Sequence, residues 1–263
     1  MRIISVKESP KPIVVHHMEH CYLRRTRLMQ NRGRFKMNTK VILSYLSELS
    51  INNNRDWYHL HKGDYKEACA RFEELLQELI HKIGKFDSSV IHNSPKDITF
   101  KIVRDTRFSH DKSPYNPAFR AHISSKSKLP IPVGYYIVIK PENQSFLGGG
   151  LFADMFKDAT GMIREYIVNN PDEWDEIIHN VEFQQIFTVK GTSLKNVPRE
   201  YDKEHPQADF LKYKSWYLEY PIQDQGFLDS ESFLLNAAKI FKIMKPFYDY
   251  LNQALVSFKM PSR

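Results

Sequence analysis

The chain is poor in cysteine and has no long apolar run, and both absences narrow the class of protein. Its 263 residues include only two cysteines, Cys21 and Cys69. Two thiols cannot build a disulfide framework or a cysteine-rich zinc site, so a reducing compartment is expected. No stretch has the length and apolar character of a membrane span or a secretory signal. The sequence therefore predicts a cytoplasmic protein with no membrane partner.

Positive charge is concentrated at the start of the chain. Lys and Arg total 38 against 31 Asp and Glu, which gives a net charge of +7. Nine of the 38 cations and two of the 31 carboxylates fall in residues 1–36, which leaves 29 of each in residues 37–263. The basic isoelectric point therefore belongs to the first segment and says little about the partner of the rest.

Residues 1–36 show no sustained period, and three interpretations compete for them. The first is a dispensable basic extension, either disordered or translated from a start codon upstream of a natural start at Met37. The second is a basic arm that binds nucleic acid. The third is a targeting peptide, because the segment is rich in Arg and poor in acidic residues. Residues 37–263 are expected to form a single globular domain.

Apolar spacing predicts helices at both ends of this domain and strands in its middle. Helices are expected over residues 41–49 and 65–83, after Ala153, from Pro171, near residues 208–213, and over residues 230–243 and 246–258. Pro246 either separates the last two stretches or kinks one long helix. Strands are expected over residues 98–108, 118–124, 133–140 and 216–222. Residues 145–152 are expected to form another strand or a turn into a helix, and residues 181–189 are expected to be extended. The order indicates an α+β fold, in which a central, mostly antiparallel sheet packs against N- and C-terminal helices.

Residues 100–115, FKIVRDTRFSHDKSPY, are the densest polar segment. Arginine offers a planar fork that suits phosphate or carboxylate, and lysine adds a point charge, so the segment is a candidate anion site. A second segment, GTSLKNVPREY, is expected to add two cations to the same pocket. The predicted anion contacts are Arg104, Arg107, Lys112, Lys195 and Arg199, supported by Asp105, His110, Asp111 and Tyr115.

A purely structural interpretation explains much of the same segment. Asp105 and Arg107 would form an ion pair, and Asp111 would accept a backbone N–H in an Asx turn. Acid–base chemistry would use Asp105, His110 or Asp111, but spacing along the chain does not establish a nucleophile–base pair. No catalytic residue or cofactor is assigned, and whether the chain is an enzyme stays open. The histidines are scattered, so no metal site is predicted.

The string RDTRFSHDKSPYN resembles the signature of a mainly bacterial family, domain of unknown function family 2461. Three further segments agree in order, namely NNNRDWYHLHKGDY, GYYIVIKPENQSFLGGGLF and GTSLKNVPREY. The resemblance covers roughly residues 37–260 and implies a domain boundary and a site at the RDTRF segment, without a biochemical activity. The family pattern usually has glycine where this chain has Glu200, which indicates a different local backbone there.

These features leave three alternative functions open. The first is binding of a phosphate- or carboxylate-bearing small molecule through the RDTRFSHDK segment. The second is association with nucleic acid through residues 96–128, which hold eight cations and three carboxylates. Exposed aromatic side chains beside those cations would favour this second function, because they provide stacking platforms. The third is a structural or scaffolding role. The sequence predicts no oligomeric state.

Overall fold

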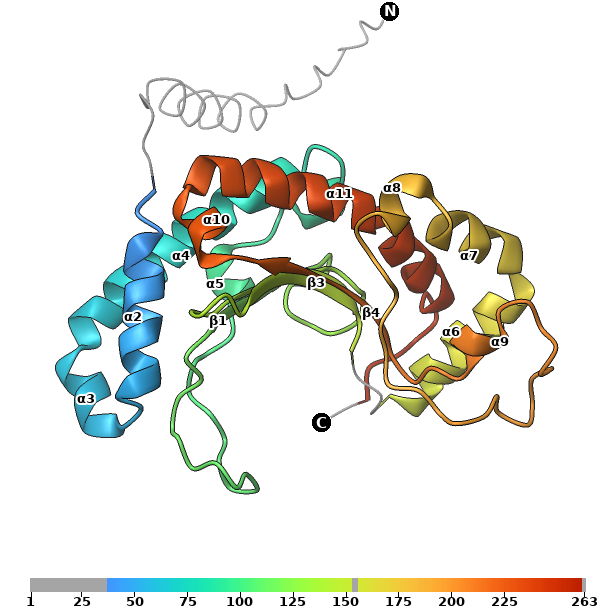
Figure 1. Ribbon diagram of the computed structural model, residues 1–263, viewed down its shortest axis with the longest axis horizontal. Helices are drawn as coiled ribbons and strands as arrows, with labels where there is room; N and C mark the ends of the chain where they lie inside the picture. Colours follow the sequence, from blue (N-terminus) through green and yellow to red (C-terminus); the bar gives the residue numbers. More distant parts are fainter. Residues whose placement is uncertain (1–36, 153–155, 262–263) are drawn as a thin grey trace, which may run out of the picture. The chain divides into compact units, whose positions relative to one another are not determined.

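Three helices near the start of the described chain pack together, and apolar spacing predicts the two longer ones. The structure is a computed structural model that describes residues 37–152 and 156–261 (Figure 1). Helices α2 (Lys40–Ile51), α3 (Arg55–Leu60) and α4 (Lys62–Ile83) follow one another, and α2 and α3 both pack against α4. Leu75, Leu76 and Leu79 of α4 are fully buried. The expectations for residues 1–36 lie outside the described residues.

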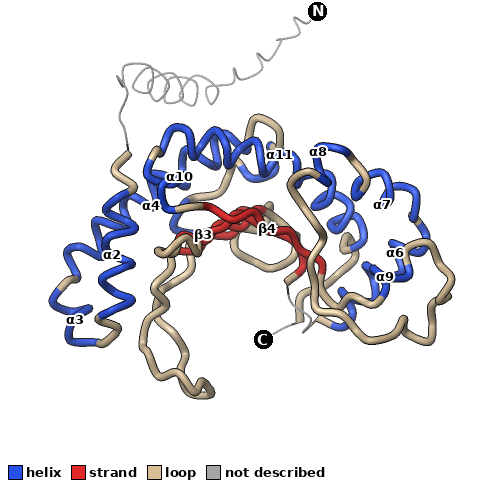
Figure 2. The backbone as a smooth tube through the Cα atoms, viewed as in Figure 1, coloured by secondary structure: helices blue, strands red, loops and turns tan. Residues whose placement is uncertain are grey.

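The centre of the fold is one antiparallel sheet of four strands. Strands β1 (Phe119–Ile123), β2 (Tyr135–Ile139), β3 (Ser145–Leu151) and β4 (Trp216–Ile222) lie side by side in that order. Every neighbouring pair is antiparallel. Figure 2 shows the sheet in red among the blue helices. The α+β prediction with an antiparallel sheet between N- and C-terminal helices is confirmed.

One face of the sheet is covered by the last long helix. After the short α10 (Asp224–Leu228), α11 (Ser230–Ala254) packs on β3 and on α4. Figure 1 shows α11 lying along the sheet and bending in its second half. Pro246 lies inside α11, so of the two expected alternatives, separate helices or one kinked helix, the structure has the single helix. Proline removes one backbone donor without ending the helix, which accounts for a bend.

Glycines in β3 allow α11 to approach the sheet closely. A Cβ added at Gly149 would collide with the hydroxyl of Tyr248 in α11 and with the carbonyl of Gly134. Gly150 adopts a φ of 136°, which side-chain-bearing residues rarely adopt. The three consecutive glycines are therefore explained by close packing within a strand rather than by a phosphate-binding loop.

A long helical excursion separates β3 from β4. It contains α6 (Lys157–Asn169), α7 (Pro171–Ile178), α8 (Val181–Gln184) and α9 (Ala208–Leu211). The prediction that residues 181–189 are extended is wrong for residues 181–184, because these residues form α8. The side chain of Asn180 accepts hydrogen bonds from the N–H groups of Glu182 (3.0 Å) and Phe183 (3.1 Å), which caps this short helix.

Residues 98–108 do not form the expected strand. The short helices η1 (Ser88–Val90) and α5 (Pro95–Ile98) precede this segment, and only single bridges follow, at Thr99 and Val103. The opposing leg contains Pro114 and Pro117, which have no N–H to donate to a ladder. The backbone pairing of residues 98–108 is therefore limited to isolated bridges and does not extend into a strand.

The described helices give no candidate for crossing a lipid bilayer. None of those in residues 37–152 and 156–261 combines the necessary length with sufficient apolar character.

Candidate functional site

The RDTRF segment lies in a long loop that leaves the outer edge of β1, here called the 99–118 loop. Its two legs are joined by a bridge between Val103 and Tyr115 and by two backbone hydrogen bonds. The N–H of Arg104 donates to Pro114 O at 2.9 Å, and that of Asn116 donates to Ile102 O at 2.7 Å. In Figure 1 the loop (green) extends away from the sheet below the β1 label.

The base of the 99–118 loop is fastened to the N-terminal helices. Asn53, between α2 and α3, donates from its amide to Tyr115 O at 2.9 Å and accepts from Tyr115 N–H at 3.1 Å. The Tyr58 ring stacks on the Tyr115 ring, with 4.5 Å between centroids. Tyr115 is 5% exposed. It therefore anchors the loop from inside and does not face a ligand.

Arg104 is occupied by partners within the loop. One guanidinium nitrogen contacts the Asp111 carboxylate and donates to Ser113 O at 3.3 Å. The other terminal nitrogen donates to Ser109 Oγ at 3.3 Å. Asp111 in turn accepts from the Ser113 N–H at 2.9 Å, which is the Asx-turn geometry. Arg104 and Asp111 thus hold the tip of the loop in shape.

The remaining charged groups of the loop lie closer to solvent. Arg107 donates to Asp105 through Nε at 3.0 Å and through a terminal nitrogen at 2.6 Å, so the expected ion pair is present. Lys112 Nζ donates to Thr106 O at 3.0 Å. Lys112 and His110 are both exposed. Phe108 at the tip is 94% exposed.

Both loop carboxylates are stabilised in their ionised forms. The Arg107 side chain lowers the pKa of Asp105, with a further contribution from the Arg107 N–H. Hydrogen bonds from the Ser113 hydroxyl and N–H, followed by the Arg104 contact, lower the pKa of Asp111. A general base or acid works best with a pKa near the operating pH, so these shifts oppose an acid–base role for either group at neutral pH.

The structure does not bring Lys195 and Arg199 to the 99–118 loop. The loop joins the sheet by the Thr99 bridge to Ala121 in β1, whereas the second segment directly follows the Lys190 bridge to Tyr217 in β4. Thr99 and Lys190 lie outside opposite edges of the four-stranded sheet, so they are about five strand spacings or 24 Å apart. The expected convergence on one pocket is therefore not found, because chain spacing contained no information about strand order.

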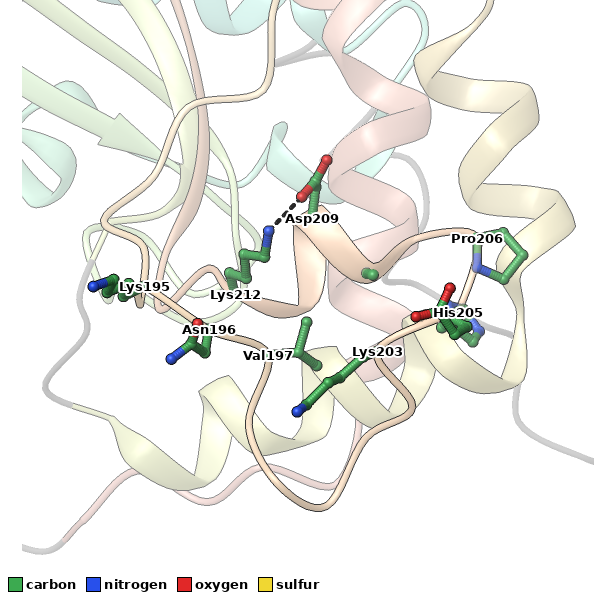
Figure 3. Close-up of a pocket in the computed structure, with 10 residues that line it drawn as sticks. Lys195, Asn196, Val197, Lys203, His205, Pro206, Asp209 and Lys212 are labelled. Carbon is green, nitrogen blue, oxygen red and sulfur yellow. Dashed lines mark hydrogen bonds and ion pairs between the residues drawn. The ribbon is translucent and has the colours of Figure 1, made fainter.

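The second segment has a pocket of its own, with a volume of about 480 Å³. Its lining includes Lys195, Asn196, Lys203, His205, Asp209 and Lys212. Lys212 is paired with Asp209 at 2.6 Å, and Figure 3 shows Lys203 and Asn196 extending on one side of the pocket. Lys195 points away from the others in this view. Arg199 is exposed and does not belong to the pocket lining.

Glu200, the last residue but one of the second segment, does not adopt a left-handed backbone. The turn closes through the Tyr201 N–H, which donates to Pro198 O at 3.0 Å. Among the described residues, the non-glycine positions with positive φ are Ser127, Glu142 and Asn143. Glu200 also lies near the buried Arg164, whose pKa is lowered by burial while Tyr201 and Glu200 oppose that shift. The residue stands in an ordinary turn.

Sequence reasoning missed a group of aromatic side chains on the sheet face that α11 leaves uncovered. Alternation along the strands places Tyr136, Phe146 and Tyr217 on that face. All three are partly exposed, and Phe152 beyond the end of β3 is 41% exposed. The detectable signal was the alternation in YYIVI and SFLGGGLF, where every second residue belongs to this face.

Comparison with protein families identifies the chain. A family model described as "Conserved hypothetical protein (DUF2461)" matches residues 41–250, most of the described part. The chain belongs to the DUF2461 family. The predicted resemblance is therefore confirmed, and the family description names no activity. No curated protein and no solved structure matches the chain.

Two of the segments that resemble DUF2461 meet in space. Asn53 belongs to NNNRDWYHLHKGDY, and Tyr115 belongs to the RDTRF segment. Their paired hydrogen bonds join segments that are 62 residues apart in the sequence. In this DUF2461 member, the first segment therefore fixes the position of the second.

Proposed function

We propose that the chain binds a phosphate- or carboxylate-bearing partner through the cations of residues 96–128. The observation that supports this proposal is an excess of exposed positive charge on that stretch. Six of its cations are exposed, namely Lys96, Lys101, Arg107, Lys112, Lys126 and Lys128. Exposed cations of this kind attract anionic partners over several ångströms.

The three carboxylates of the same stretch, Asp97, Asp105 and Asp111, form no ion pair with its exposed lysines among the described residues. Asp105 and Asp111 are each paired with an arginine of the 99–118 loop. The side chains of Lys96, Lys101, Lys126 and Lys128 form no hydrogen bond or ion pair with any described residue. These four ammonium groups are therefore available to a partner.

The loop arginines have different roles in this proposal. Arg104 acts as a positioning residue, because its guanidinium already contacts Asp111, Ser109 and Ser113. Arg107 and Lys112 remain candidates for direct contact, since both are exposed at the tip. The anion-binding role predicted for Arg104 is thus reassigned to its neighbours.

The test is calorimetric titration with inorganic polyphosphate and with citrate. Replacing Lys101, Lys112 and Lys128 together by Gln is expected to weaken binding at least tenfold and to reduce its salt dependence. The matched control replaces Lys239, Lys242 and Lys259, which are exposed elsewhere and remove the same charge. Equal losses in the two triple variants would show that only net charge matters, and the proposal would fail.

A second candidate is a small anion in the pocket beside α9. It is favoured by the presence of Lys203 and Asn196 on one side of a volume of about 480 Å³. Lys203 forms no hydrogen bond or ion pair with any described residue, so its ammonium group is available to a ligand. Citrate binding that survives the triple Lys101, Lys112 and Lys128 replacement but is lost in Lys203→Gln would assign the anion site to this pocket.

A further inference from the structure

We propose that the sheet face turned away from α11 stacks the bases of single-stranded nucleic acid. This inference rests on the proposed function, because the cations of residues 96–128 would hold the phosphates beside it. The relevant surface, here called the aromatic face, consists of Phe100, Tyr136, Phe146, Phe152 and Tyr217.

The rings of the aromatic face form a row across the sheet. The centroids of Phe100 and Tyr136 are 6.1 Å apart, and those of Tyr136 and Phe152 are 5.7 Å apart. Phe152 stacks on Tyr217 at 4.7 Å with 27° between the ring planes. The row therefore crosses from the β1 edge of the sheet to β4.

Phe146 widens this row on one side. Its ring centroid is 6.2 Å from that of Tyr136, and it lies on β3 opposite Val138 of β2. Pro221 faces Phe146 from β4 and is exposed. The strands thus offer an apolar, ring-bearing surface on which a flat group can lie.

Helix α11 leaves this face uncovered, and its rings stay partly exposed, while Val138 and His122 on the same face are buried. The helical layer formed by α11 and α4 packs on the residues with the opposite alternation, such as Ile137, Leu147 and Leu218, which are fully buried. The rings of the aromatic face are half-buried, and Phe152 is 41% exposed. In Figure 1 the sheet has α11 above it and no described helix directly beneath it.

Positive charge borders the rings on the same face. Arg120 lies over the Phe100 ring, with 5.5 Å between the guanidinium carbon and the ring centroid. Its Nε is buried without a hydrogen-bond partner among the described residues, and a terminal nitrogen donates to Lys101 O at 3.5 Å. Strand alternation places Lys140 on this face at the end of β2.

The far edge of the aromatic face carries a matched charge pair. Lys190 bridges to Tyr217 and pairs with Glu219 at 2.9 Å. Glu219 is the only carboxylate at the positions of the four strands that share this face. The surface thus combines rings with surplus cations, which is the complement of bases joined by phosphates.

Four-stranded antiparallel sheets with exposed rings are suited to this ligand. Such rings stack two or three unpaired bases, whereas a duplex keeps its base faces inside the helix. Loss of one stacking ring weakens binding by about 5- to 150-fold.

The first part of the test separates bases from phosphates. Fluorescence anisotropy of the full chain would be measured with a short oligothymidine, with an abasic oligomer of equal length and charge, and with polyphosphate as competitor. We expect oligothymidine to bind at least fivefold more tightly than the abasic oligomer. Equal binding of the two would leave the proposed function standing and overturn the sheet-face inference. Failure of every polyanion to bind would overturn both.

The second part locates the stacking surface. Phe152→Leu and Tyr217→Leu should each weaken oligothymidine binding by about 5- to 150-fold and leave polyphosphate binding unchanged. Tyr220→Leu is the matched control, because Tyr220 pairs with Leu147 and so lies on the opposite face of the same strand. Thermal unfolding would confirm that each variant is folded. If Tyr217→Leu does not fold, the binding affinity of Phe152→Leu alone tests the inference.

Three outcomes would exclude the sheet face. The first is an oligothymidine affinity that is unchanged in both Phe152→Leu and Tyr217→Leu when these variants are folded. The second is a duplex that binds as tightly as the single strand, since its bases are not free to stack. The third is thymidine monophosphate binding as tightly as the oligomer, which would indicate a nucleotide site rather than a strand-binding surface.

Discussion

His122 is a buried ionisable residue in β1, and its protonation should couple stability to pH. The side chain is 7% exposed, and burial lowers its pKa from 6.5 to about 4. The unfolded chain therefore takes up a proton below about pH 6.5, while the folded chain does so only near pH 4. The resulting stabilisation is present above pH 6.5 and is lost as the pH falls, by about 3 kcal/mol at pH 4.

Chemical denaturation of the wild type and His122→Gln across this pH range would measure the effect. Asp105 and Asp111, whose pKa values are also lowered, contribute to the acid dependence of both proteins. The difference between the two curves isolates the histidine. Parallel curves between pH 7 and pH 4 would show that His122 titrates alike in the folded and unfolded chains.

Gly149 should not tolerate a side chain. An added Cβ would collide with the Tyr248 hydroxyl and with a backbone carbonyl, so α11 would have to move off the sheet. Gly149→Ala is expected to lower the free energy of unfolding by about 1–3 kcal/mol. Gly161→Ala is the control, because Gly161 lies in α6 with no atom within 4 Å of the added Cβ. That change should stabilise the protein by about 0.5–1 kcal/mol.

At the scale of single residues, sequence reasoning located the polar segment but not the partners of its side chains. The turn residues of SHDKSPYNP predicted the Asx turn at Asp111, because that geometry is local. The contact between Arg104 and Asp111 spans seven residues and exists only after the loop has folded back. Chain spacing could not separate a structural arginine from a ligand-binding one.

At the scale of elements, the 99–118 loop depends on its attachment to the turn between α2 and α3. Replacing Asn53 by Ala leaves the N–H and C=O of Tyr115 without their side-chain partner. Loss of these bonds should reduce the free energy of unfolding by about 1–3 kcal/mol. Proteolysis should also become faster between residues 104 and 113, since the loop base is no longer fixed.

The neighbouring Asn52 provides the comparison for Asn53. Its amide donates only to Glu48 O within the exposed end of α2. Asn52→Ala should therefore change stability by less than about 0.5 kcal/mol and leave the loop protected. Equal behaviour of the two variants in denaturation and proteolysis would contradict the anchoring role of Asn53.

Helices and strands with a clear apolar period were predictable, and those set by side-chain contacts were not. The β2 segment was identified from its β-branched and aromatic residues, and α4 from apolar residues at helical spacing. By contrast, α8 is only four residues long and owes its start to the Asn180 cap. The aromatic face was missed because half-exposed rings in a strand resemble core residues when only the sequence is known.

At the scale of the whole molecule, residues 1–36 carry a charge equal to the net charge of the chain. A chain that begins at Met37 should unfold within about 2 °C of the full chain, because residues 37–263 form a unit with its own core. Differential scanning calorimetry of both chains would measure this. A drop of about 5 °C or more would mean that the basic segment contributes to folded stability.

The same pair of chains separates two sources of nucleic-acid affinity. A basic segment binds phosphates without regard to bases, and its contribution falls steeply with salt. Stacking on the aromatic face should respond to Phe152→Leu and not to the removal of residues 1–36. The neutral balance of residues 37–263 makes the local excess over residues 96–128 more informative than the overall charge.

The bridges at the two outer strands also bear on self-association. Thr99 pairs with Ala121 on the outer edge of β1, and Lys190 pairs with Tyr217 on that of β4. Exposed strand edges are templates on which a second chain can add, which leads to aggregation. The 99–118 loop therefore also covers the outer edge of β1 and hinders a second chain from pairing with that strand. Deleting the whole loop should produce a protein that precipitates on concentration, even where its core remains intact.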